Sequence, residues 1–382
     1  MKSFLFATLS IMFALVAACG QPPTGKGAGE MATAPGGAAP FRVETVAAGL
    51  EVPWSIAFAP DGRIFLTERP GRVRVIEDGK LRAEPLATIT DVSTGSESGL
   101  MGLALDPQFA KTRLLYLSYT YRGNGKQARV VRFRETSTGL TDRKVIIEGL
   151  PAADIHVGIR LRFGPDGKLF MSLGDTARRD LAQRLDSLAG KLLRLNDDGT
   201  IPPDNPFVNQ PGARPEIWSY GHRNPEGFDW QPGTNVMFDT DHGPSGFDGP
   251  GGGDEFNLVE RGKNYGWPVI HHTQTREGME SPLLEYTPAV APASGMFYRG
   301  SAFPEFQGNY FFGCLKGKCI IRVTLDGRSV RSQERLLQNT YGRIRDVAEG
   351  PDGAIYFSTS NRDGRGSPAS DDDRLMRLVP MK

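Results

Sequence analysis

The sequence predicts an all-β protein, a six-bladed β-propeller built from four-stranded antiparallel blades. Glycine (47 residues) and proline (28 residues) are frequent in the chain of 382, and helical periodicity is scarce. This combination is typical of many short strands joined by turns. A strand–turn–strand motif also recurs to the C-terminus at a spacing of roughly 45 to 65 residues, which is typical of propeller blades.

The recurring motif joins an apolar segment, a Pro-Asp-Gly turn and a strand of alternating apolar residues. It reads "AFAPDGRIFLTE" from Ala57, "RFGPDGKLFMSL" from Arg162 and "AEGPDGAIYFST" from Ala348, with looser versions from Ala104 and Asp229. Proline sets φ, aspartate caps its own backbone and glycine accepts a positive φ, so the turn is tight. About 340 residues at this spacing give roughly six blades. A β-sandwich with many insertions is the rival fold, and the sustained repeat favours the propeller.

The first 40 residues precede the repeats. Residues 1–18 begin with a basic residue and a short apolar run, "FLFATLSIMFALVAA", which is typical of an export signal rather than a membrane span. Cys19 follows small residues as in a bacterial lipobox, so we expect 1–18 to be a lipoprotein signal peptide and Cys19 to be lipidated. An ordinary cleaved signal is the alternative. Residues 19–40 are rich in Gly, Pro and Ala and are expected to be a flexible tether, and residues 41–382 form the propeller domain.

These features predict an exported protein, lipid-anchored on the periplasmic side of the outer membrane or on the cell envelope. Gly20 rather than aspartate follows the cysteine, which favours the outer membrane, and the anchor would be the only membrane contact. Export also places Cys314 and Cys319, in "GCLKGKCIIRV", in an oxidising compartment, where we expect a disulfide between them. Two free thiols are the alternative, because sequence alone does not show the geometry.

Charge and motif content exclude several classes of function. The net charge is +1, so no strong field argues for a nucleic-acid partner. The run "GPGGGD" is followed neither by "GK[ST]" nor by a helix signal, and the chain contains no Rossmann fingerprint, "HExxH" or "GxSxG". An NAD enzyme, a zinc protease and a serine hydrolase are therefore not expected.

Several polar or glycine-rich stretches stand at predicted strand ends without an obvious role in the core. They are "DIHVGIR", "SYGHRNPEG", "DHGPSGFDGPGGGDEFNLVERGKNYGWP", "YGRIRDVAEGPDG" and "CLKGKC". Taken singly, each has a structural explanation, such as a hydrogen-bonded histidine, a solvated strand face or a flexible loop. In a propeller, however, the loops of one face converge on the central axis, so that one site can draw residues from all of these stretches.

Taken together, the stretches resemble the glucose/sorbosone dehydrogenase family, the soluble quinoprotein aldose sugar dehydrogenases. The order is "VPWSIAFAPDGRIFLTER", "GLMGLALDPQF", "HVGIRLRFGPDG", "EIWSYGHRNPEG", the long glycine-rich stretch, "SGMFYRG" and "RIRDVAEGPDG". The resemblance covers nearly all of residues 41–382, and the motifs are long. It implies a six-bladed propeller that uses pyrroloquinoline quinone (PQQ) and calcium.

The resemblance also implies a role for individual residues. His156 matches the general base, and Gly243 and Pro244 match the pair whose backbone carbonyls hold calcium beside the cofactor. Glu255 and the backbone of Tyr265 match a further calcium site. The expected contacts to the quinone are His156, Arg223, Asn224, Lys316, Arg343 and Arg345.

The chemistry of these residue types agrees with the implied activity. PQQ carries three carboxylates, and Lys316, Arg343 and Arg345 offer three cations, of which the arginines bind carboxylates bidentately. Calcium accepts carbonyl oxygens and polarises the quinone. Arg223 would stabilise the charge that grows on the quinone oxygen during reduction. His156 would take the proton of an anomeric hydroxyl at neutral pH, while hydride passes from C1 to the quinone and leaves a lactone.

The chain departs from the family pattern in two places. Glu97 precedes "SGLM" where the glucose-specific branch has Gln before "GGLL", so a cofactor role for Glu97 requires that its charge be protonated or paired. The calcium loop carries an additional "SGFDGPG". The natural sugar therefore stays open, as does the electron acceptor, a cytochrome or a quinone.

Two other functions fit part of the pattern. A calcium-dependent propeller lactonase or other hydrolase would keep the metal and His156, but it would not require Lys316, Arg343 and Arg345 together. A non-catalytic propeller that binds glycans or proteins would need none of the clusters intact. The presence of all of them in one chain favours the dehydrogenase.

Overall fold

The computed structural model describes Met1 and residues 41–381 of the chain. The expected tether, the expected lipidation site Cys19 and all but the first residue of the expected signal peptide lie outside the described residues. Among the described residues, no helix is long and apolar enough to cross a membrane.

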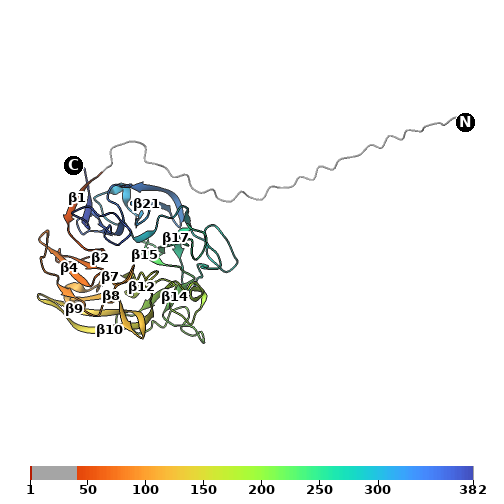
Figure 1. Ribbon diagram of the computed structural model, residues 1–382, viewed down its shortest axis with the longest axis horizontal. Helices are drawn as coiled ribbons and strands as arrows, with labels where there is room; N and C mark the ends of the chain where they lie inside the picture. The colour runs from red at the N-terminus through yellow and green to blue at the C-terminus, as the bar shows by residue number, and fades with distance from the viewer. Residues whose placement is uncertain (2–40, 382) are drawn as a thin grey trace. The chain divides into compact units, whose positions relative to one another are not determined.

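Residues 41–380 form six antiparallel sheets arranged as the blades of a propeller, as predicted (Figure 1). Blade 1 contains β2 (Pro53–Phe58), β3 (Ile64–Glu68), β4 (Arg72–Glu77), β5 (Lys80–Leu81) and β6 (Ala87–Thr88). Blade 2 contains β7 (Leu100–Leu105), β8 (Leu114–Gly123), β9 (Gly125–Thr136) and β10 (Gly139–Pro151). Blade 3 contains β11 (Leu161–Phe163), β12 (Leu169–Leu173), β13 (Lys191–Leu195) and β14 (Ile217–Tyr220).

The second half of the chain repeats the pattern. Blade 4 contains β15 (Pro225–Trp230), β16 (Met237–Asp241), β17 (Asp254–Val259) and β18 (Leu284–Tyr286). Blade 5 contains β19 (Pro292–Phe297), β20 (Tyr310–Cys314), β21 (Cys319–Asp326) and β22 (Ser329–Leu336). Blade 6 contains β23 (Ile344–Glu349), β24 (Ile355–Thr359), β25 (Leu375–Pro380) and β1 (Phe41–Ala47). The only helical segments in the described residues are α1 (Phe109–Thr112), η1 (Arg179–Gln183) and η2 (Pro304–Phe306).

Five sheets have four strands, and blade 1 differs only at its outer edge, where both β5 and β6 pair with β4. The ring closes in blade 6, because β1 from the start of the described domain pairs with β25 from its end. The first strand of each blade lies innermost and packs beside its counterparts in the neighbouring blades, as β2 does beside β7 and β23. Closure therefore protects the inner strands, so that each blade has a free edge only along its outermost strand.

The predicted Pro-Asp-Gly turns connect the first two strands of blades 1, 3 and 6. In each turn the glycine has a positive φ, and its amide donates to a carbonyl three residues earlier: Gly62 to Ala59, Gly167 to Gly164 and Gly353 to Gly350. The aspartate accepts from the amide two residues on, which is the expected capping geometry. The repeated motif is therefore a repeated hairpin.

Aromatic and aliphatic side chains fill the space between blades. Phe238 of blade 4 packs edge-on against Phe297 of blade 5, and Phe256 lies against Tyr310. All four are fully buried, and burying one such side chain contributes roughly 1.5–3 kcal/mol. This packing fixes the angle between blades and hence the spacing of the loops that precede the inner strands.

Candidate active site

His156 stands in the loop before β11 and is held by a carboxylate. Its Nδ1 lies 2.7 Å from Oδ1 of Asp175, and Oδ2 of Asp175 accepts a 2.8 Å hydrogen bond from the indole of Trp267. Because an ionised carboxylate only accepts hydrogen bonds, the neutral ring donates from Nδ1 and keeps Nε2 as an acceptor. The side chain is 5% exposed, so the basic nitrogen is both oriented and largely shielded.

The backbone of His156 is also constrained. Its φ is +51°, in the left-handed region that non-glycine residues seldom occupy. Its amide donates to Oε2 of Glu97 (2.8 Å), and its carbonyl accepts from the amide of Thr176 (3.1 Å). A side chain at Gly174 would bring a Cβ within 2.3 Å of that carbonyl. Strain of this kind persists where surrounding contacts over-determine the conformation, as they do at many functional sites.

Glu97 is ionised and paired. Its Oε1 accepts a 2.6 Å bond from Arg365, while Oε2 binds the amide of His156. Burial raises the pKa of this carboxyl, but the Arg365 charge and hydrogen bond, with the His156 amide, lower it below its usual value. The pairing that its predicted cofactor role requires is thus present, and Glu97 links the base to a loop of blade 6.

Arg223 and Asn224 precede β15 and share one anchor. Oδ2 of Asp241, at the end of β16, accepts from the amide of Arg223 (3.1 Å), and Oδ1 accepts from the amide of Asn224 (2.6 Å). The buried guanidinium of Arg223 donates from Nε to Asp248 (2.8 Å). The side-chain carbonyl of Asn224 is buried and accepts no hydrogen bond from the described residues.

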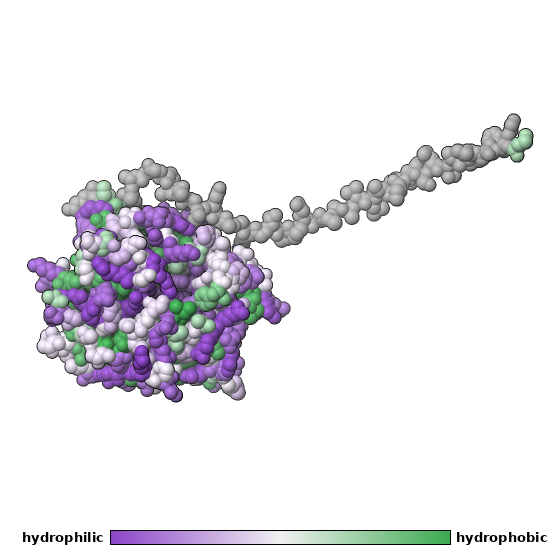
Figure 2. Space-filling view, in the orientation of Figure 1, coloured by the Kyte–Doolittle hydropathy of each residue, from purple (hydrophilic) through white to green (hydrophobic). Residues whose placement is uncertain are grey.

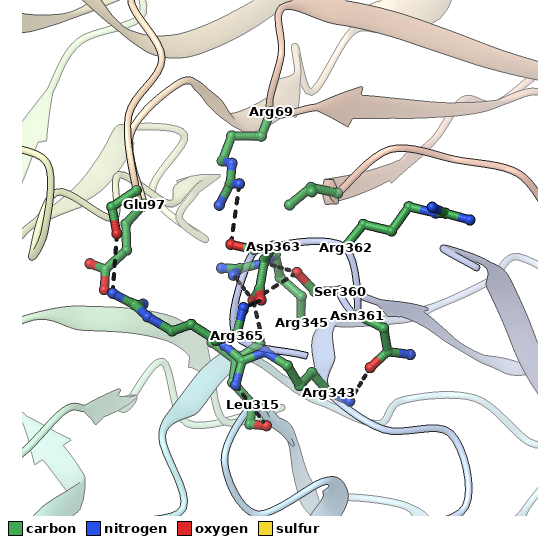
Figure 3. A network of polar contacts seen from close by, with 12 residues as sticks. Arg69, Glu97, Leu315, Arg343, Arg345, Ser360, Asn361, Arg362, Asp363 and Arg365 are labelled. Atoms are coloured by element: carbon green, nitrogen blue, oxygen red, sulfur yellow. Dashed lines mark hydrogen bonds and ion pairs between the residues drawn. The ribbon is translucent and has the colours of Figure 1, made fainter. Parts of the chain in front are cut away.

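Arg343 and Arg345 lie at the start of β23 and converge on Asp363. Their Nη2 atoms lie 2.7 Å and 3.4 Å from Oδ2 of that carboxylate (Figure 3). Arg69 reaches the backbone carbonyl of Asp363 from blade 1 at 3.4 Å. Burial lowers the pKa of Arg69 and of Arg343, and the neighbouring Arg345 lowers both further. We call the cluster in Figure 3 the arginine cradle; it comprises Arg69, Arg343, Arg345 and Arg365 around Asp363 and Glu97.

The arginine cradle carries more positive than negative charge. Four guanidinium groups face three carboxylates, because Glu226 lies 3.8 Å from Nη1 of Arg345 in addition to Asp363 and Glu97, and like charges crowd inside a partly desolvated space. Such an excess favours an anionic ligand, and guanidinium forks suit carboxylates in particular. The donor set therefore fits a polycarboxylate such as PQQ.

Lys316 lies in the turn between β20 and β21 and is exposed. Within the described residues, it makes no hydrogen bond or ion pair with the cradle. Its neighbour Leu315 does touch the cradle, because the Leu315 carbonyl accepts from Nη1 of Arg343 (3.2 Å). The structure thus brings the turn to the site without bringing the Lys316 side chain into the network.

The predicted disulfide is absent from the structure. Cys314 and Cys319 face each other across β20 and β21 as fully buried free thiols. Burial raises the pKa of Cys314 well above its usual value, and a hydrogen bond with the partner thiol raises it further. The apolar surroundings, which include Phe312, thus favour the protonated thiol.

Gly243 and Pro244, the predicted carbonyl ligands of calcium, lie in the loop after β16. The amide of Gly243 donates to Oδ1 of Asp254 (2.8 Å), and the Pro244 carbonyl accepts from the amide of Gly252 (3.1 Å). The Pro244 carbonyl is therefore already engaged, although an oxygen retains a second lone pair. The loop is closed on itself at the edge of the site, directly after the Asp241 anchor.

A second group of oxygen donors lies around Glu255, on β16 and β17 of blade 4. Register pairs Asp239 with Asn257 and Asp241 with Glu255, and alternate residues of a strand share a face, so the four side chains meet. We call this group the acidic cluster. Both carboxylate oxygens of Asp239 are buried and accept no hydrogen bond among the described residues, although Nδ1 of His222 lies 3.5 Å from Oδ2. Burial, with the charge of Asp241, raises the pKa of Asp239 to about 7 and that of Glu255 well above its usual range.

The acidic cluster fits a hard cation by its chemistry. Buried, unpaired carboxylate oxygens with raised pKa values are stabilised by a positive ion, and calcium prefers oxygen ligands. Tyr265 lies nearby through His222, because its ring stacks on that imidazole at 4.7 Å and the imidazole Nδ1 is 3.3 Å from Oδ2 of Asp241. In the part of the chain that the structure describes, no group of three His, Cys, Asp or Glu side chains is already arranged as a metal site.

The residues that hydrogen-bond to the predicted site residues were not themselves predicted. Asp175 ends the segment "KLFMSLGD", and β11 and β12 form a hairpin, so a residue before the first strand and one after the second lie at the same end. The hairpin pattern in the sequence could therefore have indicated Asp175. No comparable signal marked Trp267, Asp248, Asp363 or Arg365, because each reaches the site from another blade or a long loop.

The chain belongs to the Glucose / Sorbosone dehydrogenase family, whose model matches residues 50–376. This confirms the resemblance drawn from the motifs. Among curated relatives, the aldose sugar dehydrogenase YliI of Escherichia coli is 38% identical over 346 residues, covering 85% of this chain and 92% of the relative. A putative oxidoreductase (glucose dehydrogenase) from Thermus thermophilus has a solved structure with a TM-score of 0.82 and 42% identity, covering 89% of this chain and all of that one. The PQQ-bound aldose sugar dehydrogenase of Streptomyces coelicolor has a TM-score of 0.78 and 30% identity, covering 89% and 98%.

Proposed function

We propose that the protein is a PQQ- and calcium-dependent aldose dehydrogenase that oxidises the anomeric carbon of a sugar to a lactone. The observation that carries the proposal is the convergence of an oriented imidazole, His156 on Asp175, with an arginine cradle of excess positive charge. The PQQ-bound relative from Streptomyces supports the choice of cofactor, and the Escherichia coli relative supports the substrate class.

In this proposal, Nε2 of His156 accepts the proton of the anomeric hydroxyl. Asp175 keeps the other nitrogen protonated and stabilises the imidazolium that forms. A positioned base of this kind contributes about 10² to 10⁴-fold to the rate. PQQ, when bound, supplies the quinone that takes the hydride from C1.

The arginine cradle holds and orients the cofactor. Arg343 and Arg345 bind carboxylates and exchange part of their contact with Asp363 for the ligand. Arg223, which now contacts Asp248, Ser245 and the His242 carbonyl, would stabilise negative charge on the quinone oxygen, and Asn224 would offer a buried side-chain carbonyl. Lys316 lies on the exposed turn and would contact a carboxylate from the rim.

The chain offers two places for calcium. Gly243 and Pro244 would present backbone oxygens beside the cofactor, and Glu255 with Asp239 would hold a second ion in the acidic cluster. The Tyr265 backbone would contribute to the second place. Calcium, when bound, supplies positive charge that polarises the quinone and neutralises the buried carboxylates.

We also propose that the mature protein is exported and anchored by a lipid on Cys19, and that it passes electrons to a cytochrome or a quinone. Cys19→Ser should leave the protein soluble or unprocessed, which membrane fractionation and mass spectrometry of the N-terminus detect. Recovery of wild-type protein without lipid contradicts the anchor.

The experiment that tests the function is reconstitution of purified protein with PQQ and Ca²⁺, followed by dye reduction across a panel of aldoses. The proposal predicts PQQ-dependent turnover with at least one aldose. A propeller lactonase would instead hydrolyse lactones with calcium alone and be indifferent to PQQ. A non-catalytic binding propeller would show no turnover in either assay.

A further inference from the structure

Phe247 is a large apolar side chain left exposed beside the base. It is 65% exposed, the highest value for a large hydrophobic residue within 41–381. Its ring lies 6.0 Å from the His156 ring, centroid to centroid, with only 26° between the two planes. The face of the domain in Figure 2 is mostly hydrophilic, with apolar residues in small separate patches. Phe247 is therefore a solvent-exposed aromatic ring beside the candidate base, where a ligand can contact it.

The loop that carries Phe247, residues 245–251, is braced against the site. Asp248 accepts from Nε of Arg223 (2.8 Å) and from the amide of Ser245 (2.8 Å). The Ser245 hydroxyl accepts from Nη2 of Arg223 (3.0 Å), and the backbone carbonyl of Asp248 accepts from Arg179 (2.7 Å). Burial raises the pKa of Asp248, but the Arg223 hydrogen bond and the Ser245 amide lower it below its usual value, so the brace is ionic.

The brace decides where Phe247 points. Ser245, two residues before the aromatic position, and Asp248, directly after it, both bind the buried guanidinium of Arg223. The loop is thereby held so that the Phe247 ring lies beside the His156 ring. An aromatic ring fixed in this way binds a flat, partly apolar surface with little loss of conformational entropy.

We propose that Phe247 is the platform on which the sugar ring of the substrate packs, and that loop 245–251 selects aldoses in their cyclic form. This rests on the proposed function. A pyranose has a face of C–H groups and a rim of hydroxyls, so the face lies against the aromatic ring while the anomeric hydroxyl points to Nε2 of His156. Phe247 is accordingly a specificity-determining residue that contacts the part of the sugar that does not react.

The test compares Phe247→Ala with wild type in the holoenzyme. Loss of the platform should raise KM for pyranoses roughly 3- to 10-fold with little change in kcat, as expected for an aromatic contact of this type. KM for glyceraldehyde, which has no ring, should change less than twofold. Phe247→Tyr keeps the flat ring, so its KM for pyranoses should lie between those of wild type and Phe247→Ala. Leu283→Ala, which removes an exposed apolar side chain before β18 of the same blade, is the matched control.

A binding measurement separates this inference from the proposed function. Methyl β-D-glucopyranoside has no free anomeric hydroxyl, so its affinity, measured by calorimetry, does not depend on turnover. Weaker binding to Phe247→Ala, even without dye reduction by wild type, would support the platform and contradict the dehydrogenase. Active enzyme whose KM and glycoside affinity are the same with Phe247→Ala would overturn the platform alone. An equal rise in KM for pyranoses and glyceraldehyde would also overturn the platform. A loss of activity confined to reduction of a protein electron acceptor would overturn it as well, because Phe247 would then be a docking residue for that acceptor.

Discussion

The arginine cradle and the acidic cluster are opposite solutions to burying charge in one propeller. In the cradle, Arg343 and Arg345 lower the pKa of Asp363 although its burial raises it, so the acid is ionised and cations are in excess. In the acidic cluster, burial and the charge of Asp241 raise the pKa of Asp239 to about 7, and its oxygens accept no hydrogen bond from the described residues. In the proposed function, an anion would complete the first region and a cation the second.

This difference assigns separate ligands to neighbouring loops. The cradle draws on blades 1, 2 and 6, whereas the acidic cluster belongs to β16 and β17 of blade 4. His156 of blade 3 belongs to neither group, and its ring is hydrogen-bonded to Asp175. Substitutions should therefore affect cofactor retention, metal binding and proton transfer separately.

The largest effect is expected from His156→Ala, which removes the base but no charge from either region. The kcat of the reconstituted enzyme should fall about 10² to 10⁴-fold, while absorbance titration should show nearly unchanged PQQ affinity. A variant that lost PQQ and turnover together would indicate that His156 holds the cofactor rather than the proton. Asp175→Asn should reproduce part of the loss, since it removes the charge that stabilises the imidazolium.

The next effect is expected from Arg343→Ala or Arg345→Ala, which reduces the positive excess of the cradle. A charged hydrogen bond contributes about 1.5–3 kcal/mol, so the dissociation constant for PQQ should rise roughly 10- to 150-fold, as measured by absorbance titration. Arg377→Ala is the matched control, because Arg377, on β25 of the same blade, pairs with Glu44 of β1 and with Asp352 of the turn between β23 and β24, away from the cradle. Equal weakening by the control would mean that blade 6 stability, and not the cradle, governs retention.

A smaller effect is expected on stability as a function of pH. The pKa of Asp239 is raised in the folded state from 3.8 to about 7, so the folded protein binds more protons between those values. The contribution of Asp239 to the stability of the calcium-free protein should therefore be greatest below pH 4 and should be lost as pH rises to 7. Calcium should oppose the loss, with a gain in Tm at pH 7.5 of about 2–5 °C.

Thermal unfolding from pH 5 to 8, with and without calcium, measures this effect. Burial also raises the pKa of Asp373 to about 6. Asp373 should therefore add to the loss of stability as pH rises, and calcium should not reverse that part of the loss. A Tm that is insensitive to calcium across this range would contradict cation binding by the acidic cluster.

The smallest effect is expected from Glu255→Gln. The amide keeps the shape of the side chain and removes one of the charges that repel each other, so the Tm without calcium should rise by about 1–3 °C. The gain in Tm on adding calcium should disappear. Glu334→Gln, at a partly exposed ion pair with Arg322 in blade 5, should leave the calcium response intact.

Local sequence predicted the parts of the molecule that depend on local geometry. The Pro-Asp-Gly turns need only their own residues, and they fold as expected around Gly62, Gly167 and Gly353. Because inner strands converge in a propeller, the residues before them, such as His156 and Arg223, also come to one end of the axis. Contacts between blades were not predictable in the same way. The Trp267 bond to Asp175 spans 92 positions, and the Glu97 bond to Arg365 spans 268.

Two further residues stand differently from what their sequence motif alone indicates. Lys316 was expected among the cofactor cations; its side chain is exposed on its turn while Leu315 makes the contact to Arg343, and a contact between Lys316 and the cofactor stays a prediction. Cys314 and Cys319 were expected to be bridged; the structure pairs them across β20 and β21 as buried thiols in an apolar cluster, and the bridge between them stays a prediction. Composition and compartment indicate which residues meet and do not determine the state in which they meet.

The central claim is that the arginine cradle and His156 together make a PQQ-dependent dehydrogenase. The most direct measurement is absorbance titration of the wild-type protein with PQQ in the presence of Ca²⁺, followed by addition of an aldose to the same sample. The account predicts saturable binding of one PQQ per chain and reduction of the bound quinone by the sugar, with His156→Ala binding PQQ but not reducing it. Failure of the wild-type protein to bind PQQ, or binding without reduction by any aldose, would contradict the account.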